Sequence, residues 1–240
     1  MRLSEWFRVI IKLIEHPNGI ASTTLGRNLR ITQKTAWFMT TRLRYAMAQI
    51  DDGQPLTGIV QIDQGHLGGL NKNRHFDKKI KYIQNNIDPN YKDKLIFQAM
   101  LEENGKIRVL EIPNEEALTI HDCTIQNVDR NALLYTDSST GYNLMHYAFK
   151  NMESVNHKAK QYMNGNCTTN SVEGFWSYVK RHETSHIWIS KKYRHLYMQE
   201  ASARYNMRQM HFQAKFDTVL KATTGRLMYK DLKGQHRIAA

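Results

Sequence analysis

The chain has 240 residues, of which 41% are hydrophobic, enough for one sizeable domain with or without a small appendage. Its 34 Lys and Arg against 22 Asp and Glu give a net charge of +12, which favours a polyanionic partner such as nucleic acid. Only two cysteines occur, which excludes a disulfide framework and a four-cysteine zinc site. No apolar run approaches the roughly 20 residues that cross a bilayer, so we expect a cytoplasmic protein without a membrane partner.

Residues 1–50 have the pattern of a three-helix bundle. Apolar residues recur at helical spacing from Trp6 to Ile14, and "EHPNG" ends that helix. A short helix and a tight turn follow, and Thr32 is the expected N-cap of a helix from Gln33 to about Ala48. In that helix the expected buried stripe is Ala36, Met39, Leu43 and Met47, and the residues expected to face outward are Gln33, Lys34, Thr41, Arg42 and Arg44.

Three short helices with a basic last helix are typical of a helix-turn-helix domain. We therefore expect DNA contacts from Gln33, Lys34, Arg42 and Arg44. The alternative is a generic three-helix cap with no DNA-binding role.

Residues 56–215 are expected to form one α/β domain, and residues 216–240 a tail that frays at its polar end. The segment "IVQID" is a predicted strand, and residues 71–94, with seven Lys or Arg against three Asp, are a predicted surface loop. Two strands with a turn at Asn104-Gly105 follow, then a helix over 115–130 and the strand "ALLYTD". The segment "NMESVNH" is a short predicted strand, and helices are predicted over 169–182 and about 190–210. The order indicates a mixed sheet flanked by helices.

Two acidic residues close predicted strands, and a third lies on a later helix. Asp63 ends "IVQID", Asp137 ends "ALLYTD", and Glu173 follows Asp137 after 35 intervening residues. Each could be a cap, a pair or a solvated group when taken singly, but in a mixed sheet the three would converge. Three carboxylates repel one another unless cations lie between them, and hard oxygen ligands suit Mg²⁺. Two such ions serve an in-line displacement at phosphorus by water or by a DNA 3′-hydroxyl.

On the predicted helix over 169–182, three polar residues share one face. Asn170, Glu173 and Lys180 are spaced so that Lys180 returns to the angle of Glu173 after seven residues. We expect Lys180 to reach a DNA phosphate, with Arg181 extending the positive surface. The alternative is a solvated basic helix face.

Five blocks of the chain resemble bacterial insertion-sequence transposases. The group is the one that pairs a zinc ribbon with an RNase H-like DDE domain, the ISXO-like transposases. The resemblance runs in order from about Trp6 to Leu232, and its most specific part is TN-x-x-EGFW-x-x-x-KR in the helix. The blocks are "TQKTAWFMTTRLRYAM", "QIDQGHLGG", "LLYTDSSTGY", "VNHKAKQYMNGNCTTNSVEGFWSYVKR" and "FDTVLKATTGRLMYKDL".

The resemblance implies an RNase H-like mixed five-stranded sheet preceded by a helix-turn-helix bundle. It also implies an enzyme that cuts element ends and joins the 3′-hydroxyls to target DNA with two Mg²⁺ or Mn²⁺ ions. Partners would be the terminal inverted repeats, target DNA and further copies of the chain. By position, Asp63, Asp137 and Glu173 are the catalytic metal ligands, Asn170 is a reserve third ligand, and His157 is a supporting residue.

The chain departs from the family pattern at several positions. No four-cysteine ribbon precedes the helical bundle, and Gln64 and His66 stand where a Glu and an aromatic residue are usual. Asn166 and Thr168 replace an Asp and a His before the helix. The alternative is therefore a truncated, non-catalytic remnant that only binds DNA. A cellular RNase H-like nuclease shares the chemistry but accounts less well for the helical bundle and the "EGFW" block.

Overall fold

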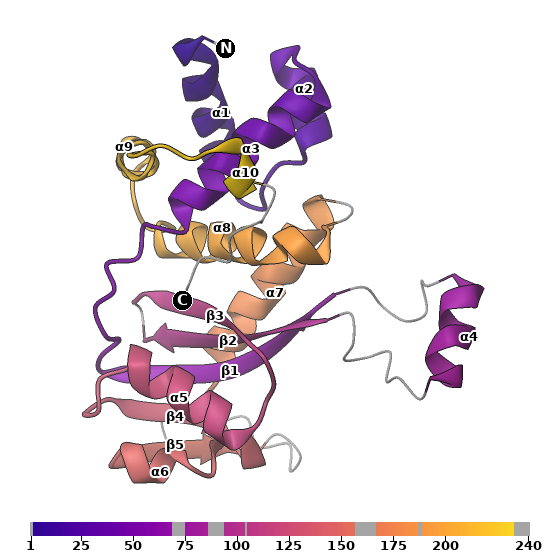
Figure 1. Ribbon diagram of the computed structural model, residues 1–240. Helices are drawn as coiled ribbons and strands as arrows, with labels where there is room; N and C mark the ends of the chain where they lie inside the picture. Colours follow the sequence, from indigo (N-terminus) through magenta and orange to yellow (C-terminus); the bar gives the residue numbers. More distant parts are fainter. Residues whose placement is uncertain are drawn as a thin grey trace. The chain divides into compact units, whose positions relative to one another are not determined.

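The computed structural model describes residues 2–68, 75–85, 94–103, 105–156, 167–186 and 189–232 (Figure 1). Contacts divide the chain into two compact units, of which one joins Met1–Gln54 with Gly174–Ala240 and the other is Pro55–Glu173. By contacts, residues 174–215 therefore belong with the N-terminal helices, whereas the sequence pattern grouped them with the α/β domain. Among the described residues, no helix is long and apolar enough to cross a membrane.

The unit over residues 55–173 is built on a five-stranded sheet. Its strands are β1 (Ile59–Leu67), β2 (Leu95–Glu102), β3 (Ile107–Ile112), β4 (Leu133–Asp137) and β5 (Asn151–Val155), in the order β3-β2-β1-β4-β5 (Figure 1). Strands β1, β2 and β3 pair antiparallel, and β4 and β5 continue the sheet from β1 in parallel. This confirms the predicted mixed five-stranded α/β sheet of the RNase H-like type.

Alternation along the strands gives the sheet two different faces. Val60 and Ile62 of β1 are fully buried in a cluster with α5 (Ala117–Asn127) and α6 (Met145–Ala148), together with the short helix η2 (Thr140–Tyr142). The opposite face carries Tyr135 and Val155, which pack with Cys167. Gln61 and Asp63 alternate with the apolar pair on β1 and so point to this second face.

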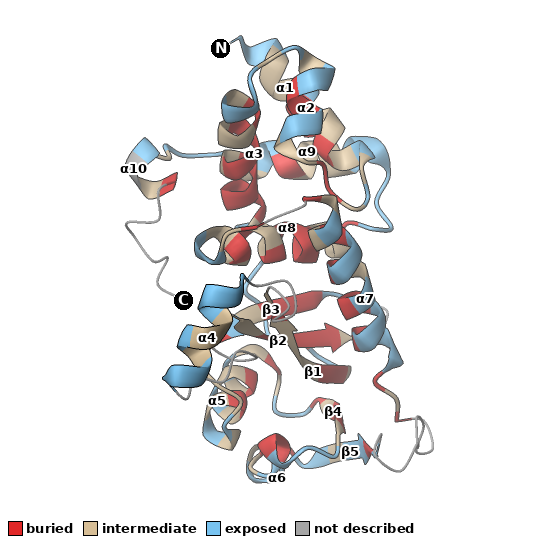
Figure 2. Cartoon of the chain, turned by 90° about the vertical axis from the view of Figure 1, so that its right-hand side faces the viewer, coloured by how far each residue is buried: buried red, intermediate tan, exposed pale blue. Residues whose placement is uncertain are grey.

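The helical unit has its own apolar core. It contains α1 (Leu3–Glu15), α2 (Ser22–Leu29), α3 (Gln33–Met47), the short helix η4 (Lys191–Tyr193), α8 (Arg194–Asn206), α9 (Phe212–Ala222) and α10 (Tyr229–Leu232). The four residues of the predicted α3 stripe are all buried, and they pack with Ala203 of α8, with Met207 just after α8 and with Val219 of α9 (Figure 2). The N-terminal bundle is thus completed by helices from the end of the chain.

The start of α3 follows the predicted cap. Thr32 Oγ1 accepts a hydrogen bond from the Thr35 amide at 3.1 Å, which confirms Thr32 as the N-cap. The preceding turn places Arg30 in the left-handed region at φ 56°, and the Ile31 amide donates to the Gly26 carbonyl. A Cβ at Gly26 would lie 3.0 Å from the Ile31 oxygen, so this tight turn favours glycine there.

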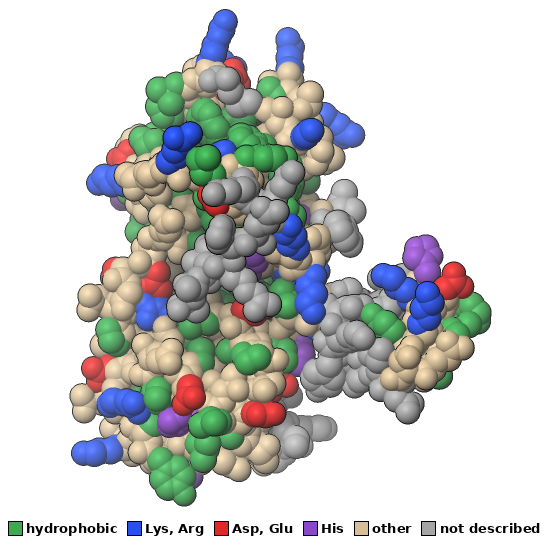
Figure 3. All heavy atoms as spheres, in the orientation of Figure 1, with side chains coloured by type: hydrophobic (Ala, Val, Ile, Leu, Met, Phe, Trp, Pro, Cys, Tyr) green, Lys and Arg blue, Asp and Glu red, His purple; other side chains and the backbone are tan. Residues whose placement is uncertain are grey.

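Two segments differ from the sequence prediction. The predicted surface loop over 71–94 contains a helix, α4 (Phe76–Gln84), within its described residues 75–85, because apolar residues recur there at helical spacing. Lysine side chains gather on α4 in Figure 3. The predicted tail contains the end of α9 and α10, and Val219 and Leu232 are fully buried. Residues 233–240 lie outside the described part.

Candidate active site

Asp63 lies within β1 and does not close it. The strand continues to Leu67, and Asp63 pairs in register with Ala99 of the antiparallel neighbour β2. The prediction that Asp63 ends its strand is therefore wrong, because pairing with β2 extends the strand through polar residues that show little hydrophobic pattern. Asp63 is half-buried, and its Oδ1 accepts a hydrogen bond from the Gln64 amide at 2.9 Å.

The parallel pairing of β1 and β4 places Asp63 and Asp137 at matching positions. Ile59 pairs with Leu133 and Gln61 with Tyr135, so paired residues differ by 74 in number. Asp63 and Asp137 differ by the same 74 and lie two residues beyond the last pair. They therefore project from adjacent strands toward the same face of the sheet. The structure brings these two predicted residues to neighbouring positions on one face of the sheet.

Tyr142 lies close to both aspartates. Its hydroxyl donates to the Ile62 carbonyl at 3.1 Å and contacts Gln64 Oε1 at 3.0 Å. Burial raises the pKa of Tyr142 well above its ordinary value, and the negative charges of Asp63 and Asp137 raise it further. The phenol is therefore a neutral donor that holds the backbone of β1 beside Asp63. The sequence analysis quoted Tyr142 only as part of a block and assigned it no role.

Gln61 connects β1 to the start of α7 (Asn170–Ser185). Its side chain is 2% exposed and lies on the Asp63 face, and Oε1 accepts hydrogen bonds from the amides of Ser171 and Val172, each at 3.1 Å. Thr168 Oγ1 accepts from the Asn170 amide at 3.2 Å. The first amides of the helix, which have no partner within the helix itself, are thus satisfied. Gln61 was missed by sequence reasoning, although a polar residue among the apolar residues of "IVQID" was a signal.

The N-terminal turn of α7 carries Glu173. The Thr169 hydroxyl donates to Glu173 Oε1 at 2.9 Å, and the Glu173 amide donates to the Thr169 carbonyl at 3.0 Å. A carboxylate here is also favoured by the positive end of the helix dipole. Gln61 therefore ties the turn that carries Glu173 to the face of β1 that carries Asp63. Asn170 is exposed in the same turn.

The oxygen atoms of the three carboxylates do not all lie within 4.8 Å of one another. Like charges repel, so three carboxylates that act together at one site need cations between them. The donor set of Asp63, Asp137 and Glu173 consists only of carboxylate oxygens. Such a set fits Mg²⁺ or Mn²⁺ by ligand type.

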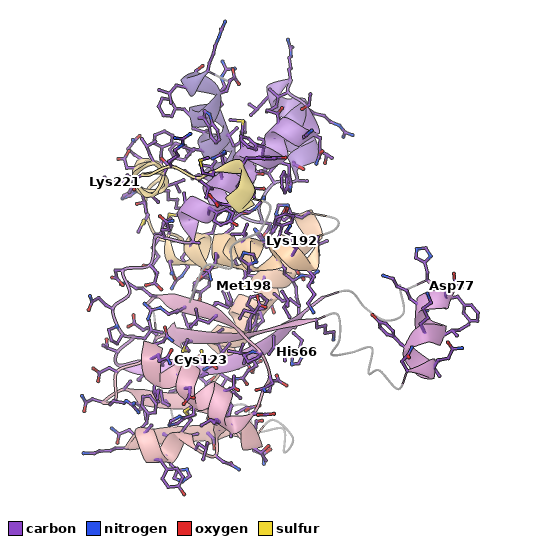
Figure 4. All side chains as sticks on the ribbon, in the orientation of Figure 1. His66, Asp77, Cys123, Lys192, Met198 and Lys221 are labelled. Atoms are coloured by element: carbon purple, nitrogen blue, oxygen red, sulfur yellow. The ribbon has the colours of Figure 1, made fainter. Side chains whose placement is uncertain are left out.

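The two unusual residues after Asp63 have partners in the structure. Gln64 Oε1 lies 3.0 Å from the Tyr142 hydroxyl, and His66 Nε2 lies 2.6 Å from Glu115 Oε1. His66 is on β1 near its end (Figure 4). Glu115 also contributes to the raised pKa of Tyr142, after burial and the two aspartates. Gln64 and His66 thus have partners on the face of β1 opposite to Asp63.

The predicted DNA-contact residues differ in exposure. Gln33, Lys34, Lys180 and Arg181 are exposed, whereas Arg42 is half-buried with its Nη1 donating to the Leu227 carbonyl at 2.6 Å. The outward orientation predicted for Thr41 and Arg44 is wrong, because both are buried, at 2% and 1% exposure. His157 and Asn166 lie outside the described residues.

Arg44 points inward because α8 presents a buried carboxylate to it. Arg44 Nε donates to Glu200 Oε2, and Arg204 donates to Glu200 Oε1 at 2.8 Å. The Arg44 guanidinium also lies over the Tyr197 ring, 3.8 Å from its centroid. Burial alone would raise the pKa of Glu200, but Arg44 and Arg204 hold it well below its ordinary value. Arg44 is a structural residue of the helical unit.

The described residues also contain a buried set of possible metal ligands, His182, His186 and Glu200, whose ligand atoms lie within 4.8 Å of one another. Glu200 is already paired with Arg44 and Arg204, so these three side chains together carry one net positive charge. A divalent cation would raise that buried charge to about three, which is strongly unfavourable. Burial also lowers the pKa of His186 to about 3, so this ring is neutral. We therefore assign this cluster to packing of the helical unit.

Comparison with known proteins identifies the family of the chain. The family model described as "ISXO2-like transposase domain" matches residues 55–206, more than half of the chain. The chain therefore belongs to the ISXO2-like transposase family, whose members are insertion-sequence transposases. It is also 26% identical over 101 residues to an "Uncharacterized transposase-like protein" of Haemophilus influenzae, a match that covers 42% of this chain and 81% of that protein.

Proposed function

We propose that this chain is a DNA transposase that cuts the ends of an insertion sequence and joins the freed 3′-hydroxyls to target DNA. The observation that carries the proposal is the shared register of Asp63 and Asp137, with Gln61 anchoring the turn of Glu173 beside them. A site for phosphate binding alone would not gather three acidic side chains, because they repel the DNA backbone unless cations intervene.

In this proposal Asp63, Asp137 and Glu173 hold two Mg²⁺ or Mn²⁺ ions, with Asn170 as the reserve third ligand. Such ions, when bound, activate the attacking oxygen and stabilise the leaving oxygen at phosphorus. The chain's own contribution is positioning. Gln61 and Thr169 fix the turn of Glu173, and Tyr142 fixes the backbone of β1 beside Asp63.

DNA contacts are proposed for the exposed polar and basic residues of the helical unit. Gln33 and Lys34 lie at the start of α3, where a helix-turn-helix domain contacts DNA. Lys180 and Arg181 are exposed on α7, and the lysines of α4 supply further phosphate contacts. Arg42 contributes through the exposed part of its side chain. The expected ligands are the terminal inverted repeats and target DNA, bound by an oligomer of this chain that holds two ends together.

The deciding experiment is Mg²⁺- or Mn²⁺-dependent nicking of DNA that carries the element's own inverted repeats. The wild-type chain is compared with Asp63→Ala, and we expect nicking that is lost in the variant. Equal nicking by both proteins would contradict the site. Salt-sensitive DNA binding without nicking by either protein would instead support the alternative of a remnant that only binds DNA.

A further inference from the structure

The helical unit contains a pocket of about 380 Å³ that the carboxylate site does not use. Its floor is apolar, with Leu13 and Ile14 of α1, Met47 of α3 and Met207 after α8. Two aromatic rings, Tyr178 of α7 and Tyr205 of α8, also line it. Pockets of this size that combine an apolar floor with a few polar groups are typical of small-ligand sites.

Four basic side chains line the same pocket: Arg181, Arg204, Arg208 and Lys215. Arg204 is committed to Glu200 and to the His16 carbonyl, so it belongs to the wall. The Arg208 guanidinium lies over the Tyr205 ring, 4.2 Å from its centroid. Arg181 is exposed and Lys215 half-buried, and neither forms an ion pair within the described residues. Arg181 and Lys215 therefore bring positive charge to the pocket that no described carboxylate pairs with.

We propose that this pocket binds one unpaired nucleotide of DNA, with the base against the Tyr178 ring and the flanking phosphates on Arg181 and Lys215. An aromatic surface stacks with any base, and neighbouring cations hold the backbone, which is the general pattern of single-strand recognition. An apolar ligand would not require the basic rim, and a bare phosphate would not require the apolar floor. The basic and apolar side chains together therefore favour an anionic ligand with a flat apolar part.

The pocket is ready for such a ligand before binding. Tyr178 donates its hydroxyl proton to the Pro17 carbonyl at 3.1 Å, and this bond fixes the ring. Burial raises the pKa of Tyr178 to about 12, so the phenol stays neutral. The Tyr178 and Tyr205 rings lie 6.4 Å apart between centroids. A fixed aromatic wall lowers the ordering cost of binding.

Gly174 offers a way to fill the pocket without disturbing its walls. This residue lines the pocket, and a Cβ built on it would meet no atom within 4 Å. Gly174→Leu therefore places a side chain in open space and adds a better helix former to α7. The variant should fold and should exclude a base from the pocket.

Lys215 and Lys221 provide a matched pair of charge variants. Both lie on α9, but only Lys215 lines the pocket, whereas Lys221 is exposed elsewhere on the helix (Figure 4). Lys215→Gln and Lys221→Gln change the net charge equally. Any difference between them reports on the pocket and excludes the effect of overall charge.

The test compares a blunt duplex with the same duplex carrying a one-nucleotide overhang of 2-aminopurine, both in EDTA. We expect the wild-type chain to prefer the overhang and to quench its fluorescence. Gly174→Leu should weaken overhang binding by about 5- to 150-fold, the range that corresponds to about 1–3 kcal/mol of base stacking. Blunt-duplex binding should be unchanged.

Lys215→Gln should lower the slope of log affinity against log salt concentration for overhang binding by about 1, the value expected for one lost phosphate contact. Lys221→Gln should leave this slope unchanged. Equal affinity of the wild-type chain for both duplexes, or an unchanged preference in Gly174→Leu, would overturn the proposal. The inference rests on the proposed function for its choice of DNA as ligand. Because the assay contains no divalent metal, its failure is distinct from a failure of nicking.

Discussion

The hydrogen bonds between Gln61 and the start of α7 predict that a Gln61 variant loses both stability and activity. In Gln61→Met, an apolar side chain of similar length replaces the acceptor, and the amides of Ser171 and Val172 lose their partner in a buried setting. An orphaned buried donor costs about 1–3 kcal/mol, and loss of an N-cap about 0.5–2 kcal/mol. We expect the free energy of unfolding to fall by about 2 kcal/mol, which lowers the melting temperature by ~4–8 °C.

The functional consequence should exceed the loss of stability. Without Gln61, the turn that carries Glu173 is no longer tied to the strand that carries Asp63. A displacement of about 1 Å costs on the order of 100-fold in rate, so Mn²⁺-dependent nicking should fall by about that factor at a temperature where the variant is folded. Binding to the inverted repeats, measured by anisotropy, should be unchanged.

Gln98 supplies the matched control. It is a fully buried glutamine on β2, and it points to the opposite face of the sheet, where its Nε2 donates to Thr124 Oγ1 at 2.7 Å. Gln98→Met should lower the melting temperature to a similar extent and leave nicking intact. If both variants lose nicking in proportion to stability, or if Gln61→Met nicks normally, the positioning argument is refuted.

Four further outcomes are expected. Asp137→Asn should abolish cleavage and leave DNA binding intact, as measured on one labelled substrate; equal loss of both would count against its role as a metal ligand. Lys34→Gln should weaken DNA binding and flatten its salt dependence, and unchanged titrations would move the contact elsewhere. Arg44→Met should cost about 3–5 kcal/mol in urea unfolding, because Glu200 loses one of its two cations, and a stable variant would disprove the buried pair. Burial lowers the pKa of His186 in the folded chain to about 3, whereas the unfolded chain protonates this histidine below about pH 6.5. The free energy of unfolding should therefore fall by about 2 kcal/mol between pH 7.5 and 5. His186→Phe should remove this contribution to the pH dependence of stability.

The two aspartates of the candidate site could be located from the sequence because each follows a strongly apolar run. "ALLYTD" and "IVQID" show where β4 and β1 are buried, and the acidic residue that follows each run is conspicuous. The full length of β1 could not be predicted in the same way, because its second half depends on pairing with β2. Pairing between distant segments leaves little trace in a local pattern.

The orientation of Arg44 shows a second limit. Helical periodicity identified the buried stripe of α3 correctly, but it assumed that one face of the helix meets solvent. Helix α8 covers part of that other face and brings Glu200, so a charged residue becomes an interior one. Gln61 was missed for a related reason, since its partners are amides some 110 residues away in the chain.

The shared register of β1 and β4 also limits how this gene can change in length. Inserting or deleting one residue between Ile59 and Asp63, or between Leu133 and Asp137, would turn the following aspartate to the opposite face. A substitution at one of these positions alters only local packing. Insertion or deletion of a single codon instead places the two aspartates on opposite faces of the sheet. Under the proposed mechanism, active descendants should therefore keep both segments at constant length, and the loss of one codon there should abolish cleavage.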